Sequence, residues 1–181
     1  LELLARSFGS FVDVAGDVTM LRVLLSAANQ LCTKDERNKI MLNGLGVTTS
    51  ILAALESFAS DDAVVAALLE TLTWMLRDDD ESVEESHRGD MVGGLWEQDI
   101  LNILIEIVEA ERVEPVLDAT LRVLQMVCAS DKGAEEAVDN GLVDMLVGFL
   151  RDRKDQHSVM CTSARFLKDL CQHNEAAKES L

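Results

Sequence analysis

The densest group of side chains that could do chemistry is acidic and lies between residues 78 and 85. It consists of Asp78, Asp79, Asp80, Glu81, Glu84 and Glu85. Carboxylates at this density are typical of a calcium loop or of a site for a basic peptide. The EF-hand pattern is not met, because Val83 replaces the required glycine and Gly89 replaces the bidentate glutamate. We therefore predict a solvated acidic loop, for which a cationic segment of a partner is the natural ligand.

Cysteine and histidine offer little further chemistry. The four cysteines include no C-x-x-C pair, so they predict neither a zinc site nor a disulfide framework, and they favour a reducing compartment, the cytoplasm or also the nucleus. We expect His87, His157 and His173 to lie apart from other ligand-type side chains, on loops or helix edges. Motifs for serine hydrolases, phosphate loops and dinucleotide binding are missing from the sequence. We predict a protein that is not an enzyme, with no metal, no cofactor and no small-molecule substrate.

Composition narrows the class of partner. The 181 residues have a formal net charge of −17, which argues against nucleic acid and anionic membranes as partners, because both attract basic proteins. The longest purely apolar run, residues 63–69, is far shorter than the roughly 20 residues that span a bilayer, so we expect no membrane insertion. A protein or a peptide remains the expected partner.

The elements that would position these side chains are helices. One proline, no tyrosine and 4% aromatic residues disfavour a β-sandwich or barrel. Apolar residues recur at helical spacing in four long stripes, 20–31, 64–76, 116–128 and 159–171, and in shorter ones at 51–58, 100–108 and 142–150. The sequence predicts an all-α fold.

Helix ends can be predicted from capping residues. Thr33 and Glu36 match a capping box, and Pro115 suits the first turn of a helix. We expect N-caps at Ser60, Ser130 and Asn174, and helix ends at Asn43-Gly44 and Asn140-Gly141.

The long helices repeat. Their ends align at Leu31, Leu76, Val127 and Leu170, with spacings of 45, 51 and 43 residues. We predict three-helix units at 35–77, 83–128 and 131–171, with a partial unit at 1–32, an inserted acidic loop at 78–94 in the middle unit, and the start of a truncated unit at 174–181. Cys32, Cys128 and Cys171 share one repeat position. We expect them to pack as small apolar side chains, because equivalent helices lie about 10 Å apart, too far for a disulfide.

At this point the chain resembles the armadillo repeat family, with HEAT repeats as the nearest rival. The resemblance rests on residues 120–128 (TLRVLQMVC) and 163–171 (SARFLKDLC), which match the end of the family's third helix, and on residues 140–147 (NGLVDMLV), which match its glycine turn and second helix. The middle unit departs from the pattern, because its turn glycine is replaced near Asp99. The resemblance covers roughly residues 17–181 and implies that residues 1–181 form one right-handed α-solenoid of about three to four repeats. Because the sequence starts without methionine and ends in mid-pattern, we expect it to be a fragment of something longer.

The resemblance does not extend to the importin type. That type carries an asparagine and a tryptophan on each third helix. The asparagine positions here hold Gln30, Met75, Met126 and Asp169, and the tryptophan positions hold Ser26, Thr71, Arg122 and Arg165. Recognition of nuclear-import cargo is therefore not expected.

In armadillo stacks the third helices line the concave groove, which makes their exposed residues the candidate binding surface. These are Arg22, Asn29, Gln30, Trp74, Arg122, Gln125, Met126, Arg165, Lys168 and Asp169. Arginines at equivalent positions, such as Arg122 and Arg165, suit an acidic or amphipathic peptide, but they are equally compatible with an ordinary solvated face. The sequence thus predicts a non-catalytic scaffold or adaptor that binds an extended or helical partner segment. The alternative is a structural or regulatory arm that docks on neighbouring domains of a larger protein.

Overall fold

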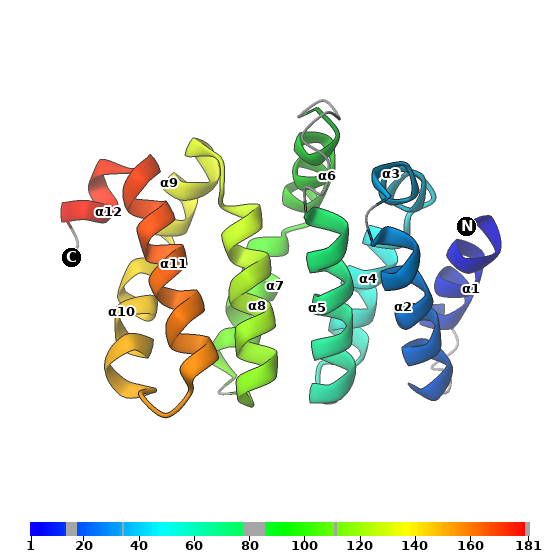
Figure 1. The fold of residues 1–181 in the computed structure, drawn as a ribbon, viewed down its shortest axis with the longest axis horizontal. Helices are drawn as coiled ribbons and strands as arrows, with labels where there is room; N and C mark the ends of the chain where they lie inside the picture. The colour runs from blue at the N-terminus through cyan, green and yellow to red at the C-terminus, as the bar shows by residue number, and fades with distance from the viewer. Residues whose placement is uncertain (14–17, 34, 78–85, 111, 180–181) are drawn as a thin grey trace. The chain divides into compact units, whose positions relative to one another are not determined.

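The computed structural model of the chain describes residues 1–13, 18–33, 35–77, 86–110 and 112–179, and within these ranges every regular element is a helix (Figure 1). The prediction of an all-α fold is confirmed. The acidic residues Asp78 to Glu85 lie outside the described residues. The chain divides into two compact units, Leu1–Glu111 and Arg112–Leu181. The boundary falls inside the predicted unit 83–128, and the assignment of one continuous array stays a prediction.

The first unit pairs helices that lie three apart in chain order. Helix α1 contacts α4, and α2 contacts α5, which runs beside it in the same direction (Figure 1). Leucines such as Leu21, Leu25, Leu68 and Leu72 are fully buried and form much of the core. The helices of this unit are α1 (Glu2–Asp13), α2 (Val18–Cys32), α3 (Glu36–Gly44), α4 (Val47–Ser57), α5 (Asp62–Leu76), α6 (Ser86–Glu97) and α7 (Ile100–Glu109).

The second unit shows the same pairing. Helix α8 packs against α11, which also contacts α9, α10 and α12. Its core includes Leu121, Leu124, Leu146 and Phe166, all of which are buried. The helices of this unit are α8 (Glu114–Val127), α9 (Asp131–Asp139), α10 (Leu142–Asp152), α11 (His157–His173) and α12 (Glu175–Glu179).

The capping predictions are confirmed at three positions. Pro115 lies in the first turn of α8. The Ser130 hydroxyl accepts a hydrogen bond from the Gly133 N–H at 3.1 Å, and the Asn174 side chain accepts one from the Ala177 N–H at 3.3 Å. Each of these short side chains satisfies a backbone donor that the first turn of a helix leaves free.

Two caps were assigned to the wrong residue. Helix α3 is capped by Asp35, whose carboxylate accepts from the Asn38 N–H at 3.2 Å, and not by Thr33. Helix α5 is capped by Asp61 and not by Ser60. The physical reason is the same in both cases: the aspartate lies directly before the first helical residue, where a short acceptor reaches the free N–H groups.

The same left-handed turn precedes three helices. Gly46 (φ +80°) precedes α4, Gly141 (φ +73°) precedes α10, and Asp99 (φ 59°) precedes α7. The predicted helix ends at Asn43-Gly44 and Asn140-Gly141 are both confirmed, because α3 ends at Gly44 and α9 is followed by Asn140 and Gly141. After α3, however, the left-handed residue is Gly46 and not Gly44. The prediction that Asp99 takes the place of the turn glycine in the middle unit is also confirmed, because Asp99 has the left-handed backbone directly before α7. Aspartate tolerates this backbone better than most side chains, and its carboxylate accepts from the Asn102 amide at 2.9 and 3.0 Å.

Candidate functional site

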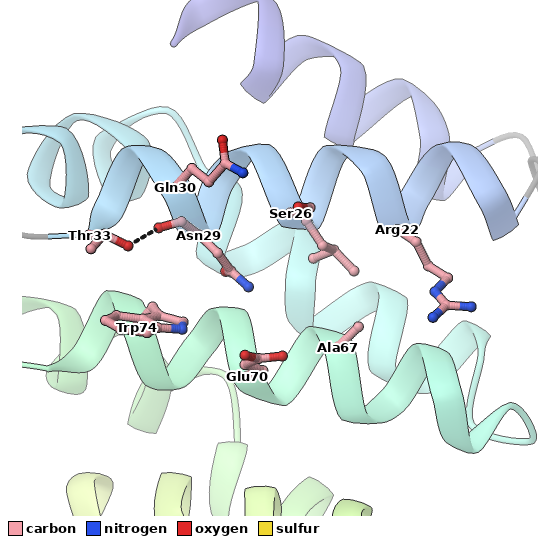
Figure 2. Close-up of a pocket in the computed structure, with 9 residues that line it drawn as sticks. Arg22, Ser26, Asn29, Gln30, Thr33, Ala67, Glu70 and Trp74 are labelled. Carbon is pink, nitrogen blue, oxygen red and sulfur yellow. Dashed lines mark hydrogen bonds between the residues drawn. The ribbon is translucent and has the colours of Figure 1, made fainter.

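A pocket of about 370 Å³ lies between helices α2 and α5, and we call it the α2–α5 pocket (Figure 2). Four of the predicted groove residues, Arg22, Asn29, Gln30 and Trp74, line it together. The structure therefore brings these side chains, from two different helices, to one place. The pocket also includes residues that the sequence analysis did not select: Leu25, Ser26, Thr33, Ala67 and Glu70.

Helical spacing explains why these residues face the pocket. On α5, Ala67, Glu70 and Trp74 are three to four residues apart, so they lie on one face. On α2, the pocket residues lie beside a buried stripe, Leu21, Leu25, Ala28 and Cys32. Small side chains at Ser26 and Ala67 leave room between the two helices, which packed leucines would have filled.

The polar groups of the pocket are mixed in charge. Figure 2 shows Arg22 at one end and Trp74 at the other, with Glu70 on α5 and the Asn29 amide, which points toward α5, between them. The Asn29 side-chain oxygen is buried and has no hydrogen-bond partner in the structure. A buried acceptor without a partner costs free energy. A ligand N–H that meets this oxygen after rotation of the Asn29 side chain would recover that cost.

Trp74 has a cation above its ring. The Arg77 guanidinium lies 5.3 Å from the ring centroid, which is cation–π geometry. This contact holds the indole along α5 at the end of the pocket, where it offers a flat apolar wall. An aromatic wall beside amide and charged groups is typical of peptide-binding surfaces.

The other predicted groove residues lie on α8 and α11 of the second unit. Arg122 forms an ion pair with Asp118 at 2.7 Å, and the Gln125 amide donates to the Asp169 carboxylate. Met126 is half-buried, and Arg165 and Lys168 are exposed on α11. Several of these polar groups are therefore engaged with each other or with their own helix.

Further hydrogen bonds join α8 to α11. The Glu114 carboxylate accepts from the Ser158 N–H at 3.2 Å and from the Ser158 hydroxyl at 2.6 Å, and the Asp118 carboxylate accepts from the Thr162 hydroxyl at 2.6 Å. Like Gln125 and Asp169, each pair is separated by 44 residues, close to the spacing of the sequence repeat. We call this set the α8–α11 seam. The sequence analysis missed it, although an acid or amide followed 44 residues later by a polar partner is a usable signal.

A buried lysine was also missed. The Lys39 side chain is fully buried, forms an ion pair with Glu36 at 3.2 Å, and donates a hydrogen bond to the main-chain oxygen of Arg77. It thereby ties α3 to the carbonyl end of α5, where a positive charge is favourable. Lys39 lies on the buried face of α3 with Leu42, and this placement is the signal that sequence reasoning could have used.

The cysteines at the shared repeat position behave as packing residues. Cys32 and Cys128 are buried, and desolvation raises the pKa of Cys32 to about 11 and of Cys128 to about 12. Both are therefore neutral thiols at physiological pH, which makes them poor nucleophiles and poor metal ligands. All four cysteines are free thiols, and Cys161 and Cys171 are half-buried.

One expectation about histidine is wrong. His157 does have a ligand-type neighbour: its Nε2 lies 3.8 Å from the Cys161 sulfur, one helical turn along α11. The spacing of four residues places both side chains on the same face of the helix. The side chains of His87 and His173 lie outside the described part of the structure. Among the described residues, no group of three or more histidine, cysteine or acidic side chains is arranged to hold a metal ion.

Comparison with known proteins adds no assignment. No protein-family model matches the chain, and neither a curated protein nor a solved structure is significantly similar to it. The described helices include none that is by itself long and apolar enough to cross a membrane, although α3 and α4 together, with a 68° bend, meet the length and composition for a broken span.

Proposed function

We propose that this chain is a non-catalytic protein-interaction module, a right-handed α-solenoid of three to four armadillo-like three-helix repeats that binds an extended or helical segment of a partner protein. The repeat architecture is supported by the pairing of helices three apart within each unit, α1 with α4, α2 with α5 and α8 with α11. The left-handed turn that recurs before α4, α7 and α10 supports it as well. Free thiols fit a cytoplasmic or nuclear location.

The α2–α5 pocket is the observation that carries the binding proposal. Its amide side chains, Asn29 and Gln30, can each donate and accept a hydrogen bond, which is what a peptide backbone requires. Arg22 and Glu70 provide one charge of each sign, and Trp74 provides an apolar wall. A partner segment would thus be held by its backbone and selected by its side chains.

The geometry favours the α2–α5 pocket over the α8–α11 seam as the binding surface. In the seam, a ligand would have to displace hydrogen bonds such as those of Asp118 and Gln125, and it would gain little in exchange. In the pocket, the Asn29 oxygen has no partner to displace. The surface on α8 and α11 that contains Arg122 and Arg165 is therefore the second candidate for binding.

A displayed library of random 12-residue peptides, selected against the immobilised chain, tests the proposal. We expect enriched peptides to bind the Asn29→Ala/Gln30→Ala variant roughly tenfold to a hundredfold more weakly, because each lost contact is worth about 1 kcal/mol or more. Isothermal titration calorimetry measures the affinities, and urea unfolding checks that the variant folds. Arg122→Ala/Arg165→Ala is the matched comparison. If only this second variant lost peptide affinity, the binding surface would lie on α8 and α11. A library that yields no enriched peptides would contradict peptide binding.

The alternative function is a structural or regulatory arm of a longer protein. The observation that favours it is exposed apolar surface on the first two helices, where Leu3, Met20 and Val23 are exposed. Side chains of this kind usually mark a surface that another protein segment covers.

A further inference from the structure

Helix α11 carries a histidine and a cysteine that the proposed function does not use. His157 is the first residue of the helix and is exposed, and Cys161, one turn later, is half-buried. The His157 Nε2 lies 3.8 Å from the Cys161 sulfur. Within the described residues neither side chain has another hydrogen bond or an ion pair, so both donor atoms are available to a ligand.

The distance between the two donor atoms is close to the distance that a shared zinc ion requires. Zinc binds an imidazole nitrogen at about 2.0–2.1 Å and a thiolate sulfur at about 2.3 Å, in tetrahedral geometry. With an angle of about 109° at the metal, these bond lengths place the nitrogen and the sulfur about 3.6 Å apart. The observed 3.8 Å differs from this separation by only about 0.2 Å. Both donors can therefore reach one ion with little movement.

Helix geometry explains why the two donors meet. Side chains four residues apart lie on the same face of an α-helix, one turn from each other. The same spacing places the two histidines of the helical zinc motif H-E-x-x-H on one ion. Helix α11 is held by its packing against α8, α9 and α10. Binding of an ion therefore has to order only two side chains, and the entropic cost is small.

The types of donor indicate which ion fits the pair. A thiolate with an imidazole suits zinc, whereas magnesium and calcium take oxygen ligands. The net charge of −17 attracts cations to the chain as a whole. Arg165, one turn after Cys161, is exposed, and its long side chain can keep its charge in water, away from the ion. Cys32 and Cys128 are buried and therefore do not compete for zinc.

We propose that His157 and Cys161 bind a zinc ion and supply two of its four ligands, with water at the remaining positions. When the zinc–sulfur bond forms, the Cys161 thiol releases its proton to the solvent. The pair corrects the expectation of no metal site, which was drawn from motifs that do not include a histidine and a cysteine at this spacing. Zinc binding at α11 requires no partner protein and is independent of peptide binding by the α2–α5 pocket.

Titration of the full 181-residue chain with cobalt(II) and then with zinc tests the site. A cobalt–thiolate bond gives a charge-transfer absorption, and displacement of cobalt by zinc gives the zinc affinity. We expect a zinc dissociation constant on the order of 10 µM or tighter at about pH 7.5. His157→Ala and Cys161→Ser should each weaken zinc binding roughly tenfold or more. Cys171→Ser is the matched control, because it removes the other half-buried thiol of α11 and should bind zinc like the wild type.

A rescue variant separates loss of the ligand from loss of structure. Cys161→His keeps two donors four residues apart, so it should bind zinc again but without the cobalt–thiolate absorption. Circular dichroism confirms that each variant is folded. A wild-type chain that binds zinc no more tightly than His157→Ala overturns the proposal, as does a cobalt–thiolate absorption that persists in Cys161→Ser. Zinc binding that is lost in Cys161→His as well would also overturn it, because the four-residue spacing would then not hold the ion.

Discussion

Lys39 illustrates how one charged side chain can be accommodated inside this protein. Its ammonium group is fully buried, and it is compensated by the Glu36 carboxylate at 3.2 Å and by the main-chain oxygen of Arg77. A buried ion pair of this kind contributes little net stability, but the loss of one partner leaves an uncompensated charge. Lys39 therefore has a structural role, in which it joins α3 to the end of α5.

The buried thiols provide a pH dependence at the residue scale. Burial raises the pKa of Cys32 to about 11 and of Cys128 to about 12, compared with about 9 for the exposed thiol. Between the two pKa values the unfolded chain has released these protons while the folded chain retains them. The free energy of unfolding should therefore fall as pH rises from about 9 toward 11, by roughly 1.4 kcal/mol per pH unit for each thiol.

Urea unfolding at a series of alkaline pH values measures this slope. The Cys32→Ala/Cys128→Ala variant should show a shallower decline than the wild type, and Cys161→Ala/Cys171→Ala, which removes the two half-buried thiols, is the control that keeps the decline. The chain has no tyrosine, so no phenol titrates in this range. Equal slopes in the wild type and the buried-thiol variant would show that these thiols do not cause the effect.

At the scale of helices, the same pairing gives two different surfaces. Helices α2 and α5 leave a pocket because Ser26 and Ala67 are small, whereas α8 and α11 are joined by hydrogen bonds such as Asp118 to Thr162. Both pairs join helices three apart in chain order, and their side chains distinguish the pair with a pocket from the pair joined by hydrogen bonds. We therefore place the proposed function in the first unit.

The close approach of α9 to the end of α8 gives a prediction at the same scale. A Cβ atom at Gly133 would lie 2.9 Å from the Cys128 Cα and 3.0 Å from the Val127 oxygen, both of which are backbone atoms. Gly133→Ala should therefore lower the free energy of unfolding by about 1–3 kcal/mol, since α9 must move away from α8. Chemical denaturation at neutral pH gives the value.

Gly148 is the matched control. It lies inside α10, and a Cβ atom there would have no atom within 4 Å. Gly148→Ala should raise stability by up to about 1 kcal/mol, because alanine loses less backbone entropy in a helix. If Gly133→Ala and Gly148→Ala changed the free energy of unfolding in the same direction, the close approach of α9 to α8 would be contradicted.

At the scale of the whole molecule, charge is the dominant property. The chain has 33 acidic and 16 basic residues. Several described ion pairs, such as Lys132 with Glu136, are exposed and contribute little to the free energy of unfolding. Repulsion among the excess carboxylates must therefore oppose folding. Most of this excess lies after residue 33.

Salt should consequently stabilise the folded chain. Raising sodium chloride from about 10 mM to about 300 mM shortens the screening length severalfold, and we expect the free energy of unfolding to rise by about 1 kcal/mol or more. Thermal unfolding followed by circular dichroism measures this stabilisation. We expect potassium chloride to have the same effect as sodium chloride. Near the sequence pI of about 4.4 the net charge vanishes, so the salt effect should disappear. A decrease in stability with salt at pH 7 would mean that attractive ion pairs outweigh the repulsion.

The positions of the long helices and of the turns between them could be predicted from local sequence. Apolar spacing located the long helices, and the replaced glycine at Asp99 was found without a structure, because backbone propensity and one-sided burial act over a few neighbouring residues. Caps were missed by one or two residues, as at Thr33 and Ser60, because several neighbouring side chains could each accept the same hydrogen bond.

Contacts between side chains of different helices could not be predicted from local sequence, because they depend on how the helices pack. That Asn29 and Trp74 share a pocket while Gln125 is bound to Asp169 depends on contacts between residues some 44 positions apart. The burial of Lys39 and the exposure of Met20 depend in the same way on which helix lies beside which. Local sequence carries no direct record of these distances, because a helix face becomes buried or exposed only when another helix packs on it.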